Sequence, residues 1–195
     1  MKHPLCVLML AGVMLAGAPL AHATIITYQA ALDGASEAPP NASPGTGFAS
    51  VITDDVAKTM AVHITFSGLI GTTTASHIHC CTAAPGTAGV ATTVPNFFGF
   101  PLGVTSGVYD VLLDMTLASS YSPGFITAHG GTTAGAEAAL FAGISLGEAY
   151  VNIHTTSHPG GEIRGFLTQV PEPASLALIG LGLAGLGFSR RRKTA

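Results

Sequence analysis

Apolar and polar residues alternate with a period of two along much of this chain, and this alternation constrains the fold more than any other feature. Successive side chains of a β-strand point to opposite faces of a sheet, so the alternation predicts strands with one face in a core. Other segments are rich in β-branched and aromatic residues, which strands favour. The alternating segments are 60–67, 108–115, 150–154 and 162–167, and the β-branched ones are 24–32 and 47–53.

Turn-forming residues separate these segments. Many short strands joined by Gly/Pro turns are typical of an antiparallel β-sandwich or a small barrel, so an all-β fold is predicted. Two segments differ: the alanine-rich residues 134–144 predict one short helix, and residues 82–106 predict an ordered loop. The turn sequences are Pro39-Pro40-Asn41, Asp54-Asp55, Pro85-Gly86 and Pro159-Gly160-Gly161.

Charged residues make up only 9% of the chain, against about a quarter in a typical soluble domain. Disordered chains are polar and highly charged, and nucleic-acid binders need a dense basic face, so both classes are excluded. Between residues 24 and 170, nine acidic residues accompany only two basic ones, Lys58 and Arg164, which gives this body a net charge of −7. An acidic body repels nucleic acid and anionic lipid.

Residues 1–23 have the organisation of a secretory signal peptide. Lys2 provides the positive start, residues 5–18 form a short apolar run, and Ala21-His22-Ala23 is a small-x-small cleavage site. This pattern predicts export by the Sec translocon and removal by signal peptidase. An uncleaved N-terminal membrane anchor is the alternative.

The C-terminal residues 170–195 combine three parts in a fixed order. Pro171-Glu172-Pro173 comes first, the uncharged and glycine-rich residues 174–189 follow, and Arg190, Arg191, Arg192 and Lys193 come last. Sixteen residues of helix span about 24 Å, slightly less than the hydrocarbon core of a bilayer. Because basic clusters stay on the cytoplasmic side, this hydrophobic helix would leave the body outside the inner membrane.

This ordered pattern resembles the PEP-CTERM sorting signal of Gram-negative bacteria. The resemblance implies that an exosortase-type enzyme recognises and removes the tail after a transient inner-membrane tether. It also implies a final place at the cell surface or outside the cell, often together with exopolysaccharide. A plain C-terminal anchor is the alternative.

Polar clusters stand out in the otherwise apolar body. In a strand, His77 and His79 point to one face, and such a His-x-His pair can bind a metal ion. The segments 148–155 and 161–165 are joined by a short turn and predict a β-hairpin. Arg164 is the only arginine of the body, so we expect Glu162, an aspartate or a loop carbonyl to pair with it.

These residues have two interpretations. One is a structural network of hydrogen bonds that fixes the register of the strands, with the members His77, His79, Asn152, His154, Glu162 and Arg164. The other is a copper or zinc site with His77, His79 and His154 as first ligands. Its reserve ligands would be Cys80, Cys81, His129 and His158.

Three motifs in order resemble the CHRD domain, which was named for its occurrence in chordin and is common in exported bacterial proteins. The resemblance implies an all-β, immunoglobulin-like sandwich, without implying an established reaction. It extends over residues 28–168, including the opening 28–40 and the segment 66–69. The motifs are 75–79, 150–155 and 159–165.

Cys80 and Cys81 depart from that pattern, since small residues such as glycine are more usual there. Export to an oxidising compartment makes free thiols short-lived. Three states are open: a disulfide between the two neighbours, which is ranked first, a disulfide to another chain, or soft metal ligands beside the histidines.

Three classes of function follow from these residues. The first, favoured one is a non-catalytic module of the cell surface or extracellular matrix that acts by binding or as a structural element. The second is a metal-binding extracytoplasmic protein, with a likeness to copper-zinc superoxide dismutase that lacks the recognisable further ligands. The third is a hydrolase with paired carboxylates from Glu162, Glu148 or Asp114. No other motif in the sequence supports this third class. The predicted organisation is 1–23 signal peptide, 24–169 CHRD-like domain and 170–195 sorting segment.

Overall fold

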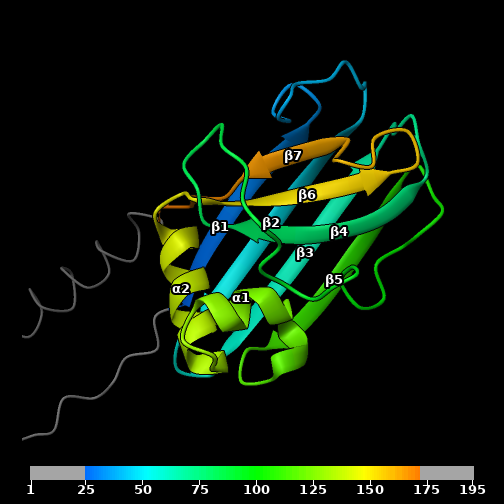
Figure 1. The fold of residues 1–195 in the computed structure, drawn as a ribbon. Helices are drawn as coiled ribbons and strands as arrows, with labels where there is room; N and C mark the ends of the chain where they lie inside the picture. The colour runs from blue at the N-terminus through cyan, green and yellow to red at the C-terminus, as the bar shows by residue number, and fades with distance from the viewer. Residues whose placement is uncertain (1–24, 172–195) are drawn as a thin grey trace, which may run out of the picture.

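The computed structural model describes residues 25–171, which form eight strands and two α-helices (Figure 1). The predicted signal peptide lies outside the described residues, as do the apolar segment 174–189 and most of the sorting motif, namely Glu172, Pro173, Arg190, Arg191 and Arg192. The strands are β1 (Ile25–Asp33), β2 (Thr46–Asp54), β3 (Thr59–Ser67), β4 (Thr73–Cys80), β5 (Gly107–Asp114), β6 (Ala149–Thr155), β7 (Ile163–Phe166) and β8 (Thr168–Gln169). The helices are α1 (Pro123–Ala128) and α2 (Thr133–Ser145), preceded by a short 3-10 turn at Ala118–Ser120.

All strand pairs are antiparallel, and the sheet follows the order β4-β6-β7-β1-β2-β3-β5, with β8 beside β1. The junction between β7 and β1 is a single residue pair, Asp33 with Arg164. The sheet curls there, so that β4, β6 and β7 cross over β1, β2 and β3 (Figure 1). The predicted all-β antiparallel fold is confirmed, and so is the predicted β6–β7 hairpin.

The core lies between these two parts of the sheet. Met60, Val62 and Ile64 of β3 are fully buried, as the alternation predicts, and they belong to one apolar cluster with residues of the crossing strands. The cluster members from β4, β6 and β7 are Ile78, Cys80, Ala149, Val151, Ile153 and Ile163. Since these residues point inward, their neighbours along each strand must lie on the outer face.

The predicted short helix is confirmed as α2. The Thr132 hydroxyl caps its first turn by accepting from the Gly135 amide, and Ala136, Leu140 and Ile144 form its buried face. The sequence did not predict α1, which spans only six residues. A single turn and a half has too few residues to show helical periodicity. Its start is nevertheless marked by Ser122, whose hydroxyl accepts from the Phe125 amide, and by Pro123 at the first helical position.

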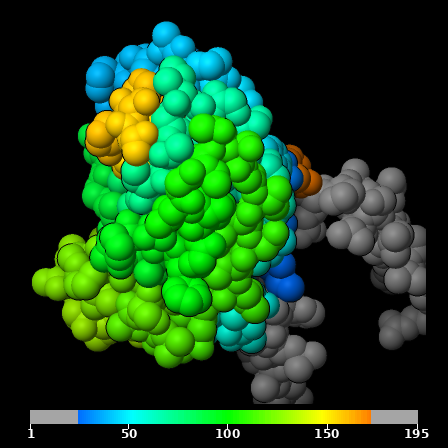
Figure 2. All heavy atoms as spheres, turned by 90° about the vertical axis from the view of Figure 1, so that its right-hand side faces the viewer, coloured from blue at the N-terminus to red at the C-terminus, as the bar shows by residue number. Residues whose placement is uncertain are grey.

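The segment after β4 forms an ordered loop, as predicted. Phe97 and Phe100 are buried, whereas Phe98 is 86% exposed. Residues 81–97, which we call the cover loop, follow the free edge of β4, where Gly89, Ala91 and Phe97 make backbone hydrogen bonds to that strand. The loop after β4 and strand β5, drawn in green, make up much of the face seen in Figure 2. Within residues 25–171, no helix is long and apolar enough to cross a membrane.

Candidate functional site: a three-histidine cluster

The candidate site lies on the outer face of β4, β6 and β7, where loops bury it. The same alternation that directs Ile78 and Val151 into the core turns His77, His79 and His154 outward. His77 is only 6% exposed and His79 only 8% exposed, while His154 is half-buried. An outer sheet face normally meets water, so these imidazoles occupy an enclosed polar site instead of an ordinary surface.

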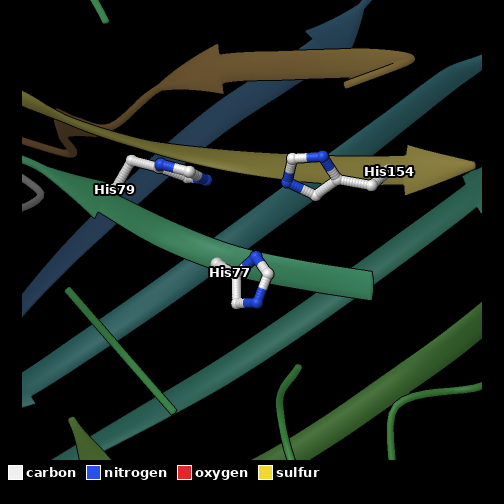
Figure 3. Close-up of side chains that lie close together, drawn as sticks. All are labelled: His77, His79 and His154. Atoms are coloured by element: carbon white, nitrogen blue, oxygen red, sulfur yellow. The ribbon is translucent and has the colours of Figure 1, made fainter. Parts of the chain in front are cut away.

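The three imidazole rings face one another (Figure 3). Their centroids are 5.7 Å apart for His77 and His79, 5.4 Å for His77 and His154, and 5.8 Å for His79 and His154. One nitrogen of each ring lies within 4.8 Å of the corresponding nitrogens of the other two. The structure thus brings together the three residues that the sequence predicts as first ligands.

The other nitrogen of each ring is held by a backbone carbonyl. His77 Nε2 lies 2.6 Å from the Pro95 oxygen, His79 Nδ1 lies 2.9 Å from the Ala88 oxygen, and His154 Nδ1 lies 3.0 Å from the Pro159 oxygen. A carbonyl can only accept, so each of these nitrogens must carry the hydrogen. In a neutral imidazole, the opposite nitrogen then presents a lone pair.

These lone-pair nitrogens are buried and have no hydrogen-bond partner among the described residues. They are His77 Nδ1, His79 Nε2 and His154 Nε2. Burial lowers the pKa of His77 to about 4, and it lowers the pKa of His79 and His154 as well. The positive charge that His154 would carry lowers the pKa of His77 and His79 further. All three rings are therefore neutral at pH 7, which is the form that binds metal ions.

Arg164 fixes the loops that cover this face. Its guanidinium donates to the carbonyl oxygens of Ser36, Pro85 and Gly86, the last two at 2.8 and 3.1 Å. Its Nε also lies 3.9 Å from Glu37 Oε2. Loop carbonyls, one of the partner classes predicted for Arg164, thus surround it, and its side chain is 1% exposed.

Tyr150 connects Arg164 to the histidines. The guanidinium carbon lies 4.8 Å from the centre of the Tyr150 ring, and the His79 ring stacks on Tyr150 with centroids 4.9 Å apart and planes 3° apart. The Tyr150 hydroxyl also accepts from the Ala88 amide at 3.2 Å. Ala88 is the residue whose carbonyl orients His79, so Arg164 and Tyr150 hold the part of the cover loop that positions this imidazole.

Comparison with known families identifies the domain. The family model of the CHRD domain matches residues 28–167, most of the chain. The chain belongs to the CHRD domain family. The PEP-CTERM protein-sorting motif matches residues 169–193. Searches of curated proteins and of solved structures found no significant match.

The sorting motif implies that the CHRD domain is exported, and that the protein passes through a membrane-tethered stage and meets an exosortase-type sorting enzyme. The candidate site is therefore carried out of the cytoplasm with the domain. Metal ions and oxidants reach a protein there without the thiol buffering of the cytosol.

The two cysteines of the CHRD domain do not belong to the histidine cluster. Cys80 and Cys81 are joined to each other by a disulfide, and both sulfurs lie against Gly143 of α2. Cys80 follows His79 in β4 and so points to the core side. Among the described residues, the group with metal-ligand geometry contains His77, His79 and His154 but none of the reserve ligands.

Glu162 has partners other than Arg164. Its carboxylate accepts from the hydroxyls of Ser43 and Thr155, both at 2.6 Å, and from the amides of Ile70 and Gly71, at 2.6 and 3.1 Å. Of the partners predicted for Arg164, Glu162 instead belongs to a separate network that joins two loops to β6. Glu162 precedes the first residue of β7, so strand alternation does not govern where its side chain points.

We expect Glu162→Gln to lower the free energy of unfolding by about 2 kcal/mol at pH 7, because an amide replaces an acceptor of four hydrogen bonds. Burial alone would raise the pKa of Glu162, but the four donors outweigh burial and hold it below its ordinary value of 4.5. The stabilisation is therefore fully present above pH 4.5 and is lost as the pH falls below it. Urea unfolding at pH 7 and at pH 3 measures both. Glu148→Gln, at a half-buried position, is the control, and an equal loss at both pH values would contradict the prediction.

The sequence did not single out several residues that complete the site. Glu37 is 5% exposed and lies beside Arg164, and the carbonyls of Ala88, Pro95 and Pro159 orient the histidines. A backbone carbonyl has no sequence signature. Glu37 does stand in the segment 28–40 that resembles the start of the family, which is the one signal that could have pointed to it.

Proposed function

We propose that this exported CHRD domain binds one transition-metal ion, copper or zinc, through His77, His79 and His154. The observation that carries the proposal is the set of three buried, unpartnered imidazole nitrogens within 4.8 Å of one another. Leaving a buried polar atom without a partner costs about 1–3 kcal/mol, and three such atoms that face one another share one explanation. A cation at their centre would satisfy all three together.

The surroundings of the rings support the same conclusion. Histidine ligands in metal sites usually donate their second N–H to a carbonyl or carboxylate, which fixes the tautomer and the ring orientation. Here the carbonyls of Pro95, Ala88 and Pro159 fill this role. Three neutral imidazoles without carboxylates suit copper or zinc, whereas calcium and magnesium prefer oxygen ligands.

The separation of the nitrogens fits a metal ion after a small adjustment. Nitrogens at 2.0–2.1 Å from a tetrahedral ion are about 3.4 Å apart. The nitrogens here lie within 4.8 Å, so rotations of the imidazoles about their side-chain bonds would bring them to the ion. The strands need not move.

Metal content of the purified protein tests the proposal. The full chain, purified in detergent without chelator and dialysed against zinc or copper, should retain about one ion per chain. His77→Ala, His79→Ala and His154→Ala should each weaken binding more than the roughly 100-fold that loss of an outer-shell partner causes. His63→Ala is the matched control, because His63 lies on β3 and pairs with Asp110. Binding that survives in all three variants, or no binding by the natural chain, would reject the proposal.

We also propose that the chain consists of a cleaved signal peptide at 1–23, the domain at 24–169 and a sorting segment at 170–195, and that the domain serves at the cell surface or in the extracellular matrix as a non-catalytic module. Arg164 and Glu162 support this structural side of the proposal, since they direct their hydrogen bonds to the domain's own loops. Mass spectrometry of the mature protein would locate both ends, and an N-terminus other than Thr24 would revise the first boundary.

A further inference from the structure

Two more buried oxygen atoms lack partners among the described residues, and both are acceptors. They are Asn152 Oδ1 and Glu37 Oε1, in side chains that are 3% and 5% exposed. The three-histidine centre already explains the unpartnered nitrogens of His77, His79 and His154 but neither of these oxygens. A bound group with hydrogens to donate would satisfy both oxygens.

Asn152 belongs to the same face as the histidines. It lies on β6 between Tyr150, which stacks on His79, and His154, and its Cα is paired across the strands with His77. Residues two apart on a strand share a face, so Asn152 lies on the same face of the sheet as the three rings.

The Glu37 carboxylate lies close to this amide, beside Gly161. Asn152 Oδ1, Asn152 Nδ2 and Glu37 Oε1 each lie 2.6 Å from the point that a Cβ on Gly161 would occupy. Gly161 also has a φ of +133°, a conformation that favours glycine. Any side chain at this position would fill the space in which the amide and the carboxylate approach each other.

The donor set leaves the metal centre incomplete. Zinc in proteins is usually four-coordinate and copper(II) prefers square-planar or tetragonal surroundings, and catalytic zinc sites combine three protein ligands with a water. Among the described residues, the group with metal-ligand geometry has only three members. A zinc or copper(II) ion here would therefore need a further, exogenous ligand, and Asn152 Oδ1 is an unpartnered acceptor on the same face that can receive its hydrogen.

We infer that the centre is an open one: the fourth position holds a water that donates to Asn152, and a small protic molecule can replace this water. The inference rests on the proposed metal binding. The donors of Arg164 are directed to carbonyl oxygens, and the oxygens of Asn152 and Glu37 accept. The site thus selects small neutral ligands that carry an O–H or N–H, such as water, alcohols, hydroperoxides or hydroxylamine, over anions such as azide, which have no hydrogen to donate.

The cobalt(II) form of the full chain provides the test, because exogenous ligands change the visible absorption of cobalt. Hydroxylamine and azide are similar in size, but only hydroxylamine has hydrogens to donate. We expect hydroxylamine to bind the natural protein at least tenfold more tightly than azide. Asn152→Leu should bind one cobalt ion per chain yet reduce this preference to threefold or less. Gln169→Leu, an exposed amide on β8, should leave it unchanged.

Different outcomes test the open fourth position and the proposed metal binding separately. If cobalt binds at one ion per chain and neither ligand alters the spectrum, or azide binds as tightly as hydroxylamine, the inference fails while metal binding stands. If cobalt, zinc and copper all fail to bind, the proposed function fails and the inference with it. If zinc or copper binds but cobalt does not, the inference fails while metal binding stands. The comparison in the natural protein decides even where Asn152→Leu does not fold.

Discussion

Replacing Arg164 with methionine is expected to lower the free energy of unfolding by about 3–5 kcal/mol, a large part of the stability of a domain of this size. Methionine fills a similar volume but donates no hydrogen bond. The carbonyls of Ser36, Pro85 and Gly86 would lose their common donor, and the buried Glu37 carboxylate would lose the positive charge beside it. For a domain of about 150 residues, this loss corresponds to a fall in Tm on the order of 10 °C.

Two variants separate the geometry of Arg164 from its charge. Arg164→Lys keeps the charge but cannot direct donors to three carbonyls at once, so we expect it to recover less than half of the loss. His63→Met removes an exposed partner of the exposed Asp110 and should change stability by less than about 1 kcal/mol. Urea unfolding with m-values measures all three. A loss below 1 kcal/mol in Arg164→Met would contradict the role of the guanidinium.

A variant of Glu37 provides a second test of the stabilisation by Arg164. Burial raises its pKa to about 7, although the nearby Arg164 charge lowers it. Without Arg164, the carboxylate would be buried with no opposite charge beside it. Glu37→Gln should therefore restore part of the stability lost in Arg164→Met, and the double variant should be more stable at pH 8 than the sum of the single effects. Strict additivity would show that the two groups do not interact.

The sequence predicts the strands and the face of the histidines because both depend on local alternation. Met60, Val62 and Ile64 are buried and His77 and His79 share the outer face, as a period of two requires. The same rule would place Glu162 on the face of Arg164, but the structure directs it to other partners. It stands one residue before β7, where the pleat that enforces alternation has not begun.

Long-range pairing is what the sequence leaves undetermined. His154 enters the cluster because β6 pairs with β4 in a register that matches His77 with Asn152. The carbonyls that orient the rings come from the cover loop and from the β6–β7 turn, and Glu37 arrives from the loop after β1. Their positions depend on how the sheet curls at the single pair that joins β7 to β1. A pattern of residue types does not reveal which backbone carbonyl will accept a hydrogen bond. It also does not reveal where two parts of a sheet will cross.

Saturation with the bound metal is expected to produce the other large change, a rise in the free energy of unfolding of about 4 kcal/mol when the free ion is at 1,000 times its Kd. The unfolded chain has no preformed cluster, so binding energy becomes folding energy. The Tm should rise on the order of 10 °C and return to its starting value when a chelator is added. Differential scanning calorimetry of the full chain with zinc, with copper and with chelator measures the shift.

Variants of one ligand distinguish metal binding from packing. His79→Phe keeps a ring that can stack on Tyr150 but removes the lone pair of Nε2 and the hydrogen bond to the Ala88 oxygen. Without metal, the lost hydrogen bond is worth about 1 kcal/mol, and removal of the unpartnered nitrogen offsets it, so the metal-free stability should change little. With metal, most of the rise should disappear, while His63→Phe should retain it. A metal-induced rise that persists in His79→Phe would place the ion elsewhere, and a large loss without metal would make the histidine a packing residue alone.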